Sequence, residues 1–128
     1  MTLKKYSEPK AQFGSATLWY SKVVRAGDTY YLSGQPGADK ETGVGQGDAR
    51  AQTKIAFKNA AELLATVGLT LDHIVKVTVY LADARDFMLM NQGMREVFPG
   101  EPPARVTVTA QPVLDTKIEI DVVAYKTP

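Results

Sequence analysis

An arginine and a glutamate in the C-terminal part of the chain are the residues best suited to chemistry. Arg105 and Glu119 lie in the segments 104–109 and 117–125, in which polar and apolar side chains alternate. Alternation with a period of two predicts β-strands that bury one face. In both segments most odd-numbered side chains are polar and the even-numbered ones are apolar. If the two strands pair as neighbours, Arg105 can therefore lie opposite Glu119, with Val106 on the core face.

Such a pairing would place a guanidinium group and a carboxylate on the same side of the sheet. A guanidinium group binds a carboxylate through two parallel hydrogen bonds, so Arg105 could hold an acidic ligand. Pro102 and Pro103 restrict the backbone that leads to this arginine. The alternative is a cross-strand ion pair on a solvated sheet face, and the pattern alone favours this alternative.

Asn91 is a polar residue on the apolar stripe of a predicted helix, in which Phe87, Met90, Met94 and Phe98 recur. A buried amide that lacks partners costs about 1–3 kcal/mol. Asn91 therefore either hydrogen-bonds to backbone in the core or lies where the stripe opens onto a pocket.

Several other kinds of site are disfavoured by the residues present. The sequence has no cysteine, which excludes a thiol nucleophile, a cysteine-ligated zinc site and an iron–sulfur cluster. His73 is the only histidine, so it has no partner for a metal pair and is interpreted as a strand-end residue. Gly43, Gly45 and Gly47 have the spacing G-x-G-x-G, which differs from that of nucleotide-binding loops and indicates loop glycines.

The composition is typical of a globular domain, and we expect one domain over residues 1–128. Hydrophobic residues make up 45% of the chain, charged residues 23%, and the net charge is +1. Near-neutral charge argues against nucleic-acid binding, and Lys4, Lys5 and Lys10 are expected to belong to a solvated terminus. No apolar run approaches the roughly 20 residues of a membrane span, so we expect no membrane association and a cytoplasmic location.

The pattern from Val23 onward predicts five strands and two helices, whereas residues 1–18 show the least pattern. In order, these are strands at 23–25 and 29–33, a helix at 48–67, a strand at 74–81, a helix from Asp83 to Phe98, and strands at 104–109 and 117–125. Asp48 is placed to cap the first helix and Gly68 to end it. Strands with one buried face and helices long enough to cover it predict a two-layer α+β sandwich rather than an all-parallel α/β fold.

Several short segments also occur in an order and spacing that resemble a known family. They are Tyr20-Ser21, Ser33-Gly34-Gln35-Pro36-Gly37, Gln52-Thr53 with Asn59, residues 75–81, Asp86-Phe87 with Asn91, Pro103-Ala104-Arg105 and Ile118-Glu119-Ile120. The set resembles the Rid (YjgF) family, the reactive intermediate deaminases. The resemblance covers residues from about 18 to 125, and the ordered set is far more specific than any one segment.

The resemblance implies a chorismate-mutase-like fold, with a mostly antiparallel sheet and two helices on one face. It also implies a homotrimer with ligand clefts between subunits. The implied reaction is hydrolysis of reactive 2-imino acids and their enamine tautomers, such as 2-iminobutanoate and 2-iminopropanoate, to 2-oxo acids and ammonia. An imine carbon is already electrophilic, so this chemistry needs positioning, water and a general base but no metal or organic cofactor.

The resemblance further implies roles for particular residues. Arg105 would grip the substrate carboxylate, Glu119 would orient the attacking water, and Tyr20 would act with them in catalysis. The other residues that match the cleft, and are expected to bind substrate, are Ser33, Gly34, Asn91 and Thr107.

Three positions depart from the family pattern. Leu18-Trp19 precede Tyr20 in place of Gly-Pro, Thr107 replaces a frequent cysteine, and Met94 replaces a frequent tyrosine. The first departure bears on the mouth of the cleft and therefore on the choice of substrate.

Two other functions remain as alternatives. A non-catalytic trimeric module that binds small 2-oxo acids or other carboxylates would use Arg105 without needing Glu119. A ribonuclease function, also reported in the family, fits poorly with a net charge of +1 and a single histidine.

Overall fold

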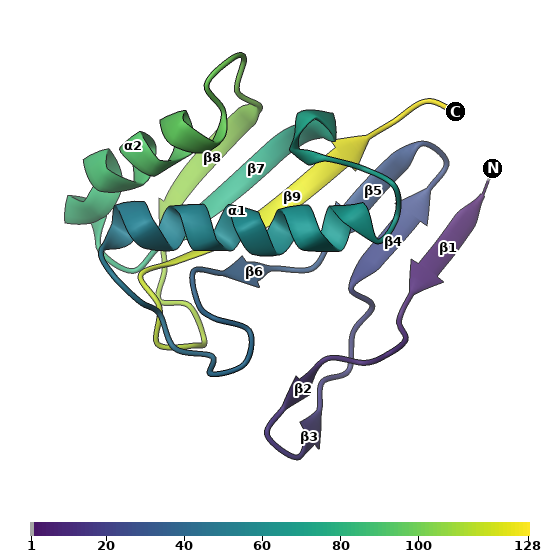
Figure 1. Ribbon diagram of the computed structural model, residues 1–128, viewed down its shortest axis with the longest axis horizontal. Helices are drawn as coiled ribbons and strands as arrows, with labels where there is room; N and C mark the ends of the chain where they lie inside the picture. Colours follow the sequence, from purple (N-terminus) through teal and green to yellow (C-terminus); the bar gives the residue numbers. More distant parts are fainter. Residues whose placement is uncertain (1) are drawn as a thin grey trace.

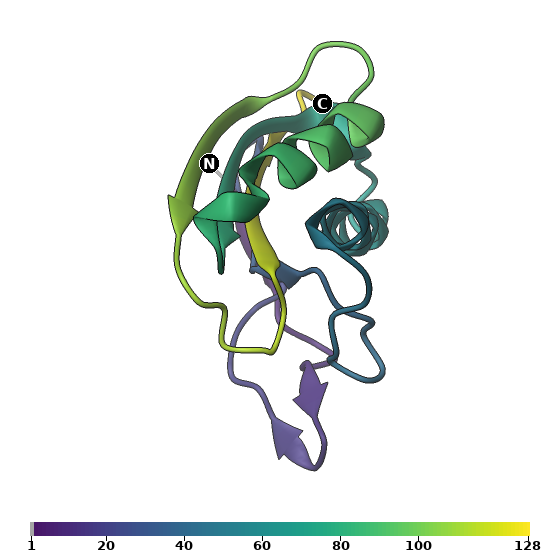
Figure 2. The same ribbon diagram turned by 90° about the vertical axis from the view of Figure 1, so that its left-hand side faces the viewer.

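The computed structural model describes residues 2–128 as a twisted sheet with two helices packed against one of its faces (Figures 1 and 2). Seven strands form this sheet in the order β1-β4-β5-β9-β7-β8, with β6 paired to β9, while β2 and β3 form a separate hairpin. The predicted two-layer α+β sandwich is confirmed. In chain order, the elements are β1 (Leu3–Tyr6), β2 (Gln12–Phe13), β3 (Ala16–Thr17), β4 (Val23–Ala26), β5 (Thr29–Leu32), β6 (Gln35–Pro36), α1 (Ala49–Ala65), β7 (Ile74–Leu81), α2 (Phe87–Val97), β8 (Ala104–Thr109) and β9 (Ile118–Tyr125), with short 3-10 helices at Leu71–His73 and Ala84–Asp86.

The order of the strands separates the two C-terminal strands. β7 lies between β8 and β9, and it is parallel to β8 and antiparallel to β9. A parallel pair needs a long crossover connection, which α2 provides. Arg105 is the register partner of Val77, and Glu119 is the register partner of Tyr80. The prediction that Arg105 lies opposite Glu119 on a neighbouring strand is therefore wrong.

The core lies between the sheet and the helices. Phe57 of α1 packs edge-on against Phe98 at the end of α2, with 5.1 Å between ring centroids. Both rings belong to one buried cluster with alternate residues of β7 and β9. The predicted burial of Met90, Met94 and Phe98 is confirmed, whereas Phe87 is 41% exposed. Val75 is exposed although the alternation of β7 predicts it on the buried face, because the strand is irregular between Ile74 and Lys76. The largest fully buried side chains of the core are Phe57, Leu64, Leu81, Met90, Ile118, Ile120, Val23, Val77, Val79 and Val122.

The predicted capping of α1 is also confirmed. Oδ1 of Asp48 accepts a hydrogen bond from the backbone nitrogen of Ala51 at 2.9 Å. The helix ends at Ala65, two residues before the predicted end, and Gly68 follows with a φ of +79° that favours glycine. His73 lies just before β7 and its Nδ1 accepts a hydrogen bond from the backbone nitrogen of Thr70 at 3.0 Å, in agreement with a strand-end role.

β8 turns its apolar residues outward, contrary to prediction. Val106 and Val108 are 45% and 41% exposed, whereas Arg105 and Thr107 are half-buried beside the buried residues of β7. Val106 therefore does not lie on the core face. Alternation shows that a strand has two different faces, but it does not show which one a helix covers.

The N-terminal segment contributes a strand that the sequence pattern does not indicate. β1 forms one edge of the sheet and pairs with β4. Lys4 and Lys5 on this strand are exposed, as expected for a solvated segment. Because backbone hydrogen bonds hold β1 at the edge, its side chains need no buried face and show no clear alternation.

The crossing of the two helices depends on a glycine. A Cβ atom at Gly93 would lie 2.8 Å from Cβ of Thr53 and 2.9 Å from the backbone oxygen of Arg50. Gly93→Ala must therefore push α2 away from α1. We expect it to lower the free energy of unfolding by about 1–3 kcal/mol in chemical denaturation.

Gly100→Ala is the matched control for this measurement. A Cβ atom at Gly100 would meet no atom within 4 Å, so its stability should stay close to that of the wild type. Equal stability of the Gly93→Ala and Gly100→Ala proteins would contradict the close crossing of α1 and α2.

Candidate active site

Arg105 lies on the helix-facing side of β8, where residues of α2 surround its guanidinium group. Its Nη1 donates a hydrogen bond to Oδ1 of Asn91 at 3.0 Å and lies 3.8 Å from Sδ of Met90. The guanidinium carbon lies 5.6 Å from the centroid of the Phe87 ring, a cation–π contact. None of these partners is charged, and no carboxylate of residues 2–128 forms an ion pair with Arg105. The guanidinium group is therefore not neutralised within this part of the chain.

Arg105 and Asn91 line a cavity of about 490 Å³ between the end of α2 and the loop that leads into β8. Apolar side chains and prolines form most of its remaining wall, among them Met94, Phe98 and Pro103. Of the two interpretations of Asn91, the structure supports the pocket. Its carbonyl oxygen accepts a hydrogen bond from Arg105 and so orients the guanidinium group at the cavity wall.

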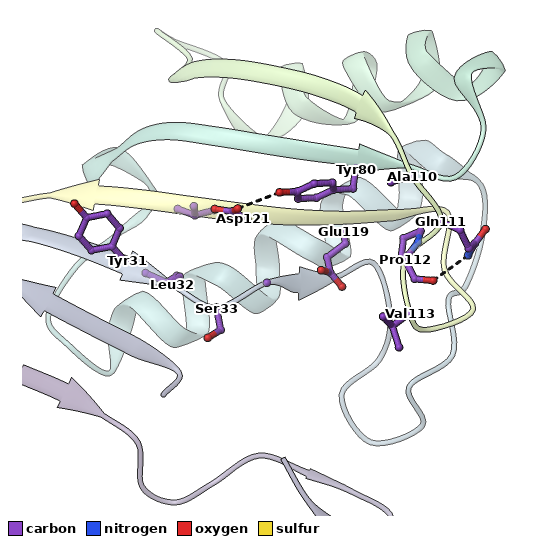
Figure 3. Close-up of a pocket in the computed structure, with 12 residues that line it drawn as sticks. Tyr31, Leu32, Ser33, Tyr80, Ala110, Gln111, Pro112, Val113, Glu119 and Asp121 are labelled. Carbon is purple, nitrogen blue, oxygen red and sulfur yellow. Dashed lines mark hydrogen bonds between the residues drawn. The ribbon is translucent and has the colours of Figure 1, made fainter. Parts of the chain in front are cut away.

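Glu119 lines a second cavity, of about 470 Å³. Figure 3 shows its carboxylate between the segment that carries Ser33 and the loop that carries Pro112 and Val113. A Cβ atom at Gly34 would lie only 2.7 Å from Oε2 of Glu119, so a glycine there leaves room for the carboxylate. The other residues that line this cavity are Tyr31, Leu32, Tyr80, Ala110, Gln111, Asp121 and Val122.

The surroundings of Glu119 raise its pKa above the ordinary value for a glutamate. Burial is the main cause, and the negative charge of Asp121 on the same strand adds to it. Asp121 in turn accepts a hydrogen bond from the hydroxyl group of Tyr80 at 3.3 Å. Burial also raises the pKa of Tyr20, and the charge of Glu119 raises it further. A raised pKa makes the carboxylate of a glutamate a stronger base, which suits it to proton transfer.

The hydroxyl groups of Ser33 and Thr107 make no polar contact with Glu119 or Arg105. Oγ of Ser33 donates a hydrogen bond to the backbone oxygen of Ser21 at 2.6 Å, which ties the end of β5 to the segment before β4. Thr107 lies two residues beyond Arg105 on the same face of β8, and its Oγ1 is buried without a hydrogen-bond partner in residues 2–128.

The predicted site residues fall into two groups, one on each face of the sheet. Arg105 shares the helix-facing side with its buried neighbour Val77, whereas Glu119 shares the outer face with Tyr80. The prediction that the arginine and the glutamate face the same side is therefore wrong within one chain. The helix-facing group consists of Arg105, Asn91 and Thr107, and the group around Glu119 contains Ser33, Gly34 and Tyr20.

Some residues of these two groups were not predicted. Asp121 could have been found, because alternation places it on the same face of β9 as Glu119. Tyr31 and Tyr80 lie on other strands, and only the order of the strands brings them to the same cavity.

Other kinds of site find no support among the described residues. Residues 2–128 contain no group of three or more histidine, aspartate or glutamate side chains that could hold a metal ion. No helix in this part of the chain has the length and apolar character that crossing a bilayer requires. In the glycine-containing loop before α1, a Cβ atom at Gly45 would lie 2.9 Å from both polar atoms of the Gln52 side chain, which indicates a packing role.

Comparison with known proteins identifies relatives over most of the chain. Residues 11–126 match the model of the family described as Endoribonuclease L-PSP. The chain is 38% identical over 112 residues to the human protein named 2-iminobutanoate/2-iminopropanoate deaminase, a match that covers 85% of this chain and 81% of that protein. It is also 38% identical over 109 residues to a RutC family protein of Pyrococcus horikoshii, with 84% and 86% covered.

Solved structures show the same relationship. Yeast Mmf1 matches with a TM-score of 0.83 at 29% identity, covering 98% of this chain and 100% of that one. RidA from an Antarctic Psychrobacter species matches with a TM-score of 0.77 at 30% identity, covering 98% and 99%. The resemblance found in the sequence is confirmed. The chain belongs to the Endoribonuclease L-PSP family, which comprises the YjgF, RutC and Rid proteins.

Proposed function

We propose that this protein hydrolyses reactive 2-imino acids, such as 2-iminobutanoate and 2-iminopropanoate, to 2-oxo acids and ammonia. The observation that carries the proposal is Arg105, whose guanidinium group lines a cavity and contacts only uncharged side chains. Relatives named for this activity, from human and mouse, support the choice of substrate.

In the proposed mechanism, Arg105 binds the substrate carboxylate through two parallel hydrogen bonds, and Asn91 keeps the guanidinium group oriented. Water then attacks the carbon of the protonated imine, and Glu119 accepts a proton from this water as the carbon–oxygen bond forms. Tyr20, whose pKa responds to the charge of Glu119, assists the proton transfer. Glu119 then gives this proton to the nitrogen of the resulting carbinolamine. The carbon–nitrogen bond breaks and ammonia leaves as the hydroxyl oxygen forms the carbonyl of the 2-oxo acid. The proton that the hydroxyl group loses passes to the released ammonia, so Glu119 is again a carboxylate.

The proposed site needs two copies of the chain, because Arg105 and Glu119 lie on opposite faces of the sheet in one copy. We propose a homotrimer whose clefts each take Arg105 from one subunit and Glu119 from its neighbour. The outer face of the sheet supports this assembly, since it exposes Tyr31, Val106 and Val108, and apolar surface of this kind is commonly covered by a partner.

Arg105→Ala tests the carboxylate-binding role. We expect kcat/KM for 2-iminobutanoate to fall by about 100-fold or more, because two charge-assisted hydrogen bonds are lost. The imine is generated in the assay by a threonine dehydratase, and its decay is followed with and without the protein. Arg85→Ala is the control, since Arg85 is exposed and pairs with Asp83. Equal imine decay with wild-type and Arg105→Ala protein would remove the proposal.

Mixing two inactive variants tests the shared cleft. Arg105→Ala and Glu119→Gln proteins should each be nearly inactive, and refolding them together in equal amounts should restore roughly a quarter of the clefts if subunits assemble at random. Light scattering measures the assembly, and the imine assay measures the recovered rate. A monomer, or a mixture with no recovered activity, would contradict a cleft built from two subunits.

The acid limit of activity tests Glu119 as the base. A base acts when deprotonated, so kcat/KM should fall as the pH falls through the pKa of Glu119, at a higher pH than for an ordinary glutamate. Asp121→Asn removes a negative charge that raises this pKa, so it should move the acid limb to lower pH. Glu119→Gln should abolish this fall of kcat/KM at acidic pH, together with most of the activity. If kcat/KM of the Asp121→Asn protein falls at the same pH as that of the wild type, Glu119 is not the base.

A non-catalytic carboxylate-binding module is the second candidate. It is favoured by the position of the Arg105 cavity, which lies on the other face of the sheet from Glu119 and could bind a small 2-oxo acid by itself. In that case the wild type would not accelerate imine decay, and Glu119→Gln would bind a 2-oxo acid as tightly as the wild type in titration calorimetry. An endoribonuclease is less well supported, because a net charge of +1 gives little attraction for RNA.

A further inference from the structure

α1 carries two buried amide side chains that bond outside the helix. Gln52 and Asn59 are 3% and 5% exposed. They are seven residues apart, which is close to two helical turns, so they lie on the same face of α1. Both make hydrogen bonds to backbone groups outside α1. Gln52 reaches the start of β9 and Asn59 reaches β6, and Glu119 lies next to both.

Gln52 holds the start of β9. Its Oε1 accepts a hydrogen bond from the backbone nitrogen of Lys117 at 2.8 Å, and its Nε2 donates one to the backbone oxygen of Gly47 at 3.1 Å. Gly37 fits between this side chain and the strand, because a Cβ atom there would lie 2.7 Å from both Cβ of Gln52 and Cγ2 of Ile118. The helix, the end of β6 and the start of β9 are therefore tightly packed at this point.

Asn59 holds β6 and the residues that follow it. Its Nδ2 donates hydrogen bonds to the backbone oxygens of Pro36 at 3.1 Å and Ala38 at 3.0 Å. Pro36 of β6 is the register partner of Glu119 on β9. Gly34, just before β6, lies against the Glu119 carboxylate so closely that a Cβ atom would lie 2.7 Å from Oε2. A small shift of β6 or of the start of β9 would change this contact.

We propose that Gln52 and Asn59 are positioning residues for the deamination proposed above, holding β6 and β9 so that the Glu119 carboxylate lies against Gly34. The inference rests on that proposed function. Neither amide touches the cavity of Glu119, because both lie on the helix side of the sheet and the carboxylate lies on the outer face. Their influence passes through the backbone of β6 and β9.

Gln52→Met tests the proposal, because methionine nearly keeps the shape of glutamine and loses both hydrogen bonds. We expect kcat for 2-iminobutanoate to fall by roughly tenfold or more, as for a misplaced catalytic group. KM should change little, since the substrate carboxylate is bound by Arg105, which is held by residues of α2 and not by Gln52. Leu64→Val is the matched control, because it removes buried volume from the far end of α1 and should lower stability without lowering kcat. Asn59→Leu is the second variant, should Gln52→Met fail to fold.

A double-mutant cycle separates positioning from a general loss of structure. In the Glu119→Gln background, Gln52→Met should lower kcat no further, because the group it positions is already absent. A purely structural role would lower kcat by the same factor in both backgrounds and would overturn the proposal.

The pKa of Glu119, measured by carbon NMR of the labelled carboxyl group, gives a readout without substrate. The titratable groups that face this carboxyl are Asp121 on β9, Tyr80 on β7, Tyr31 on β5 and Tyr20 before β4. Loosening β6 admits water, so Gln52→Met should lower the raised pKa toward its ordinary value, and Leu64→Val should leave it unchanged. An unchanged pKa in the Gln52→Met protein overturns the inference. The wild type could also lack deaminase activity while the pKa of Glu119 still falls in the Gln52→Met protein. That result overturns the proposed reaction and leaves the positioning by Gln52 and Asn59 supported.

Discussion

The alternation of side chains across β7 and its two neighbours governs where the candidate site residues lie. Successive residues of a strand point to opposite faces, and β7 aligns β8 and β9 on its two sides. The register then gives Arg105 the helix-facing side and Glu119 the outer side. A guanidinium group and a carboxylate that would otherwise form an ion pair are kept apart by the thickness of the sheet, so neither neutralises the other.

The two faces consequently offer different electrostatic surroundings. The guanidinium group of Arg105 is held by an amide, a thioether and an aromatic ring, which orient a cation without cancelling its charge. Around Glu119, burial and the carboxylate of Asp121 raise the pKa instead. In the reaction we propose, the carboxylate of the imino acid would bind at Arg105, and its protonated imine would lie near the carboxylates of Glu119 and Asp121.

The fold around Glu119 relies on close backbone approach. Gly34 and Gly37 allow the segment around β6 to pack against β9 and α1 at distances that a Cβ atom would prevent. Gln52 and Asn59 satisfy the backbone groups that this packing would leave unpaired. Hydrogen bonds thereby join α1 to β6, to the residues that follow it and to the start of β9. In the positioning we propose, these bonds on the helix side of the sheet determine where the Glu119 carboxylate lies on the outer side.

The sequence alone predicted five strands and two helices from Val23 onward but not the short strand β6, together with the two-layer architecture and the place of Arg105, Glu119 and Asn91 in a recognisable ordered set. Hydrophobic periodicity carries that information, because apolar residues recur at the spacing of the face that a helix or strand buries. The three-dimensional structure was needed to show that β7 separates β8 from β9, which face of β8 is covered, and that residues 3–6 form an edge strand. Strand pairing is made by backbone hydrogen bonds, which every residue can accept and every residue except proline can donate, so side-chain patterns do not reveal which strands become neighbours.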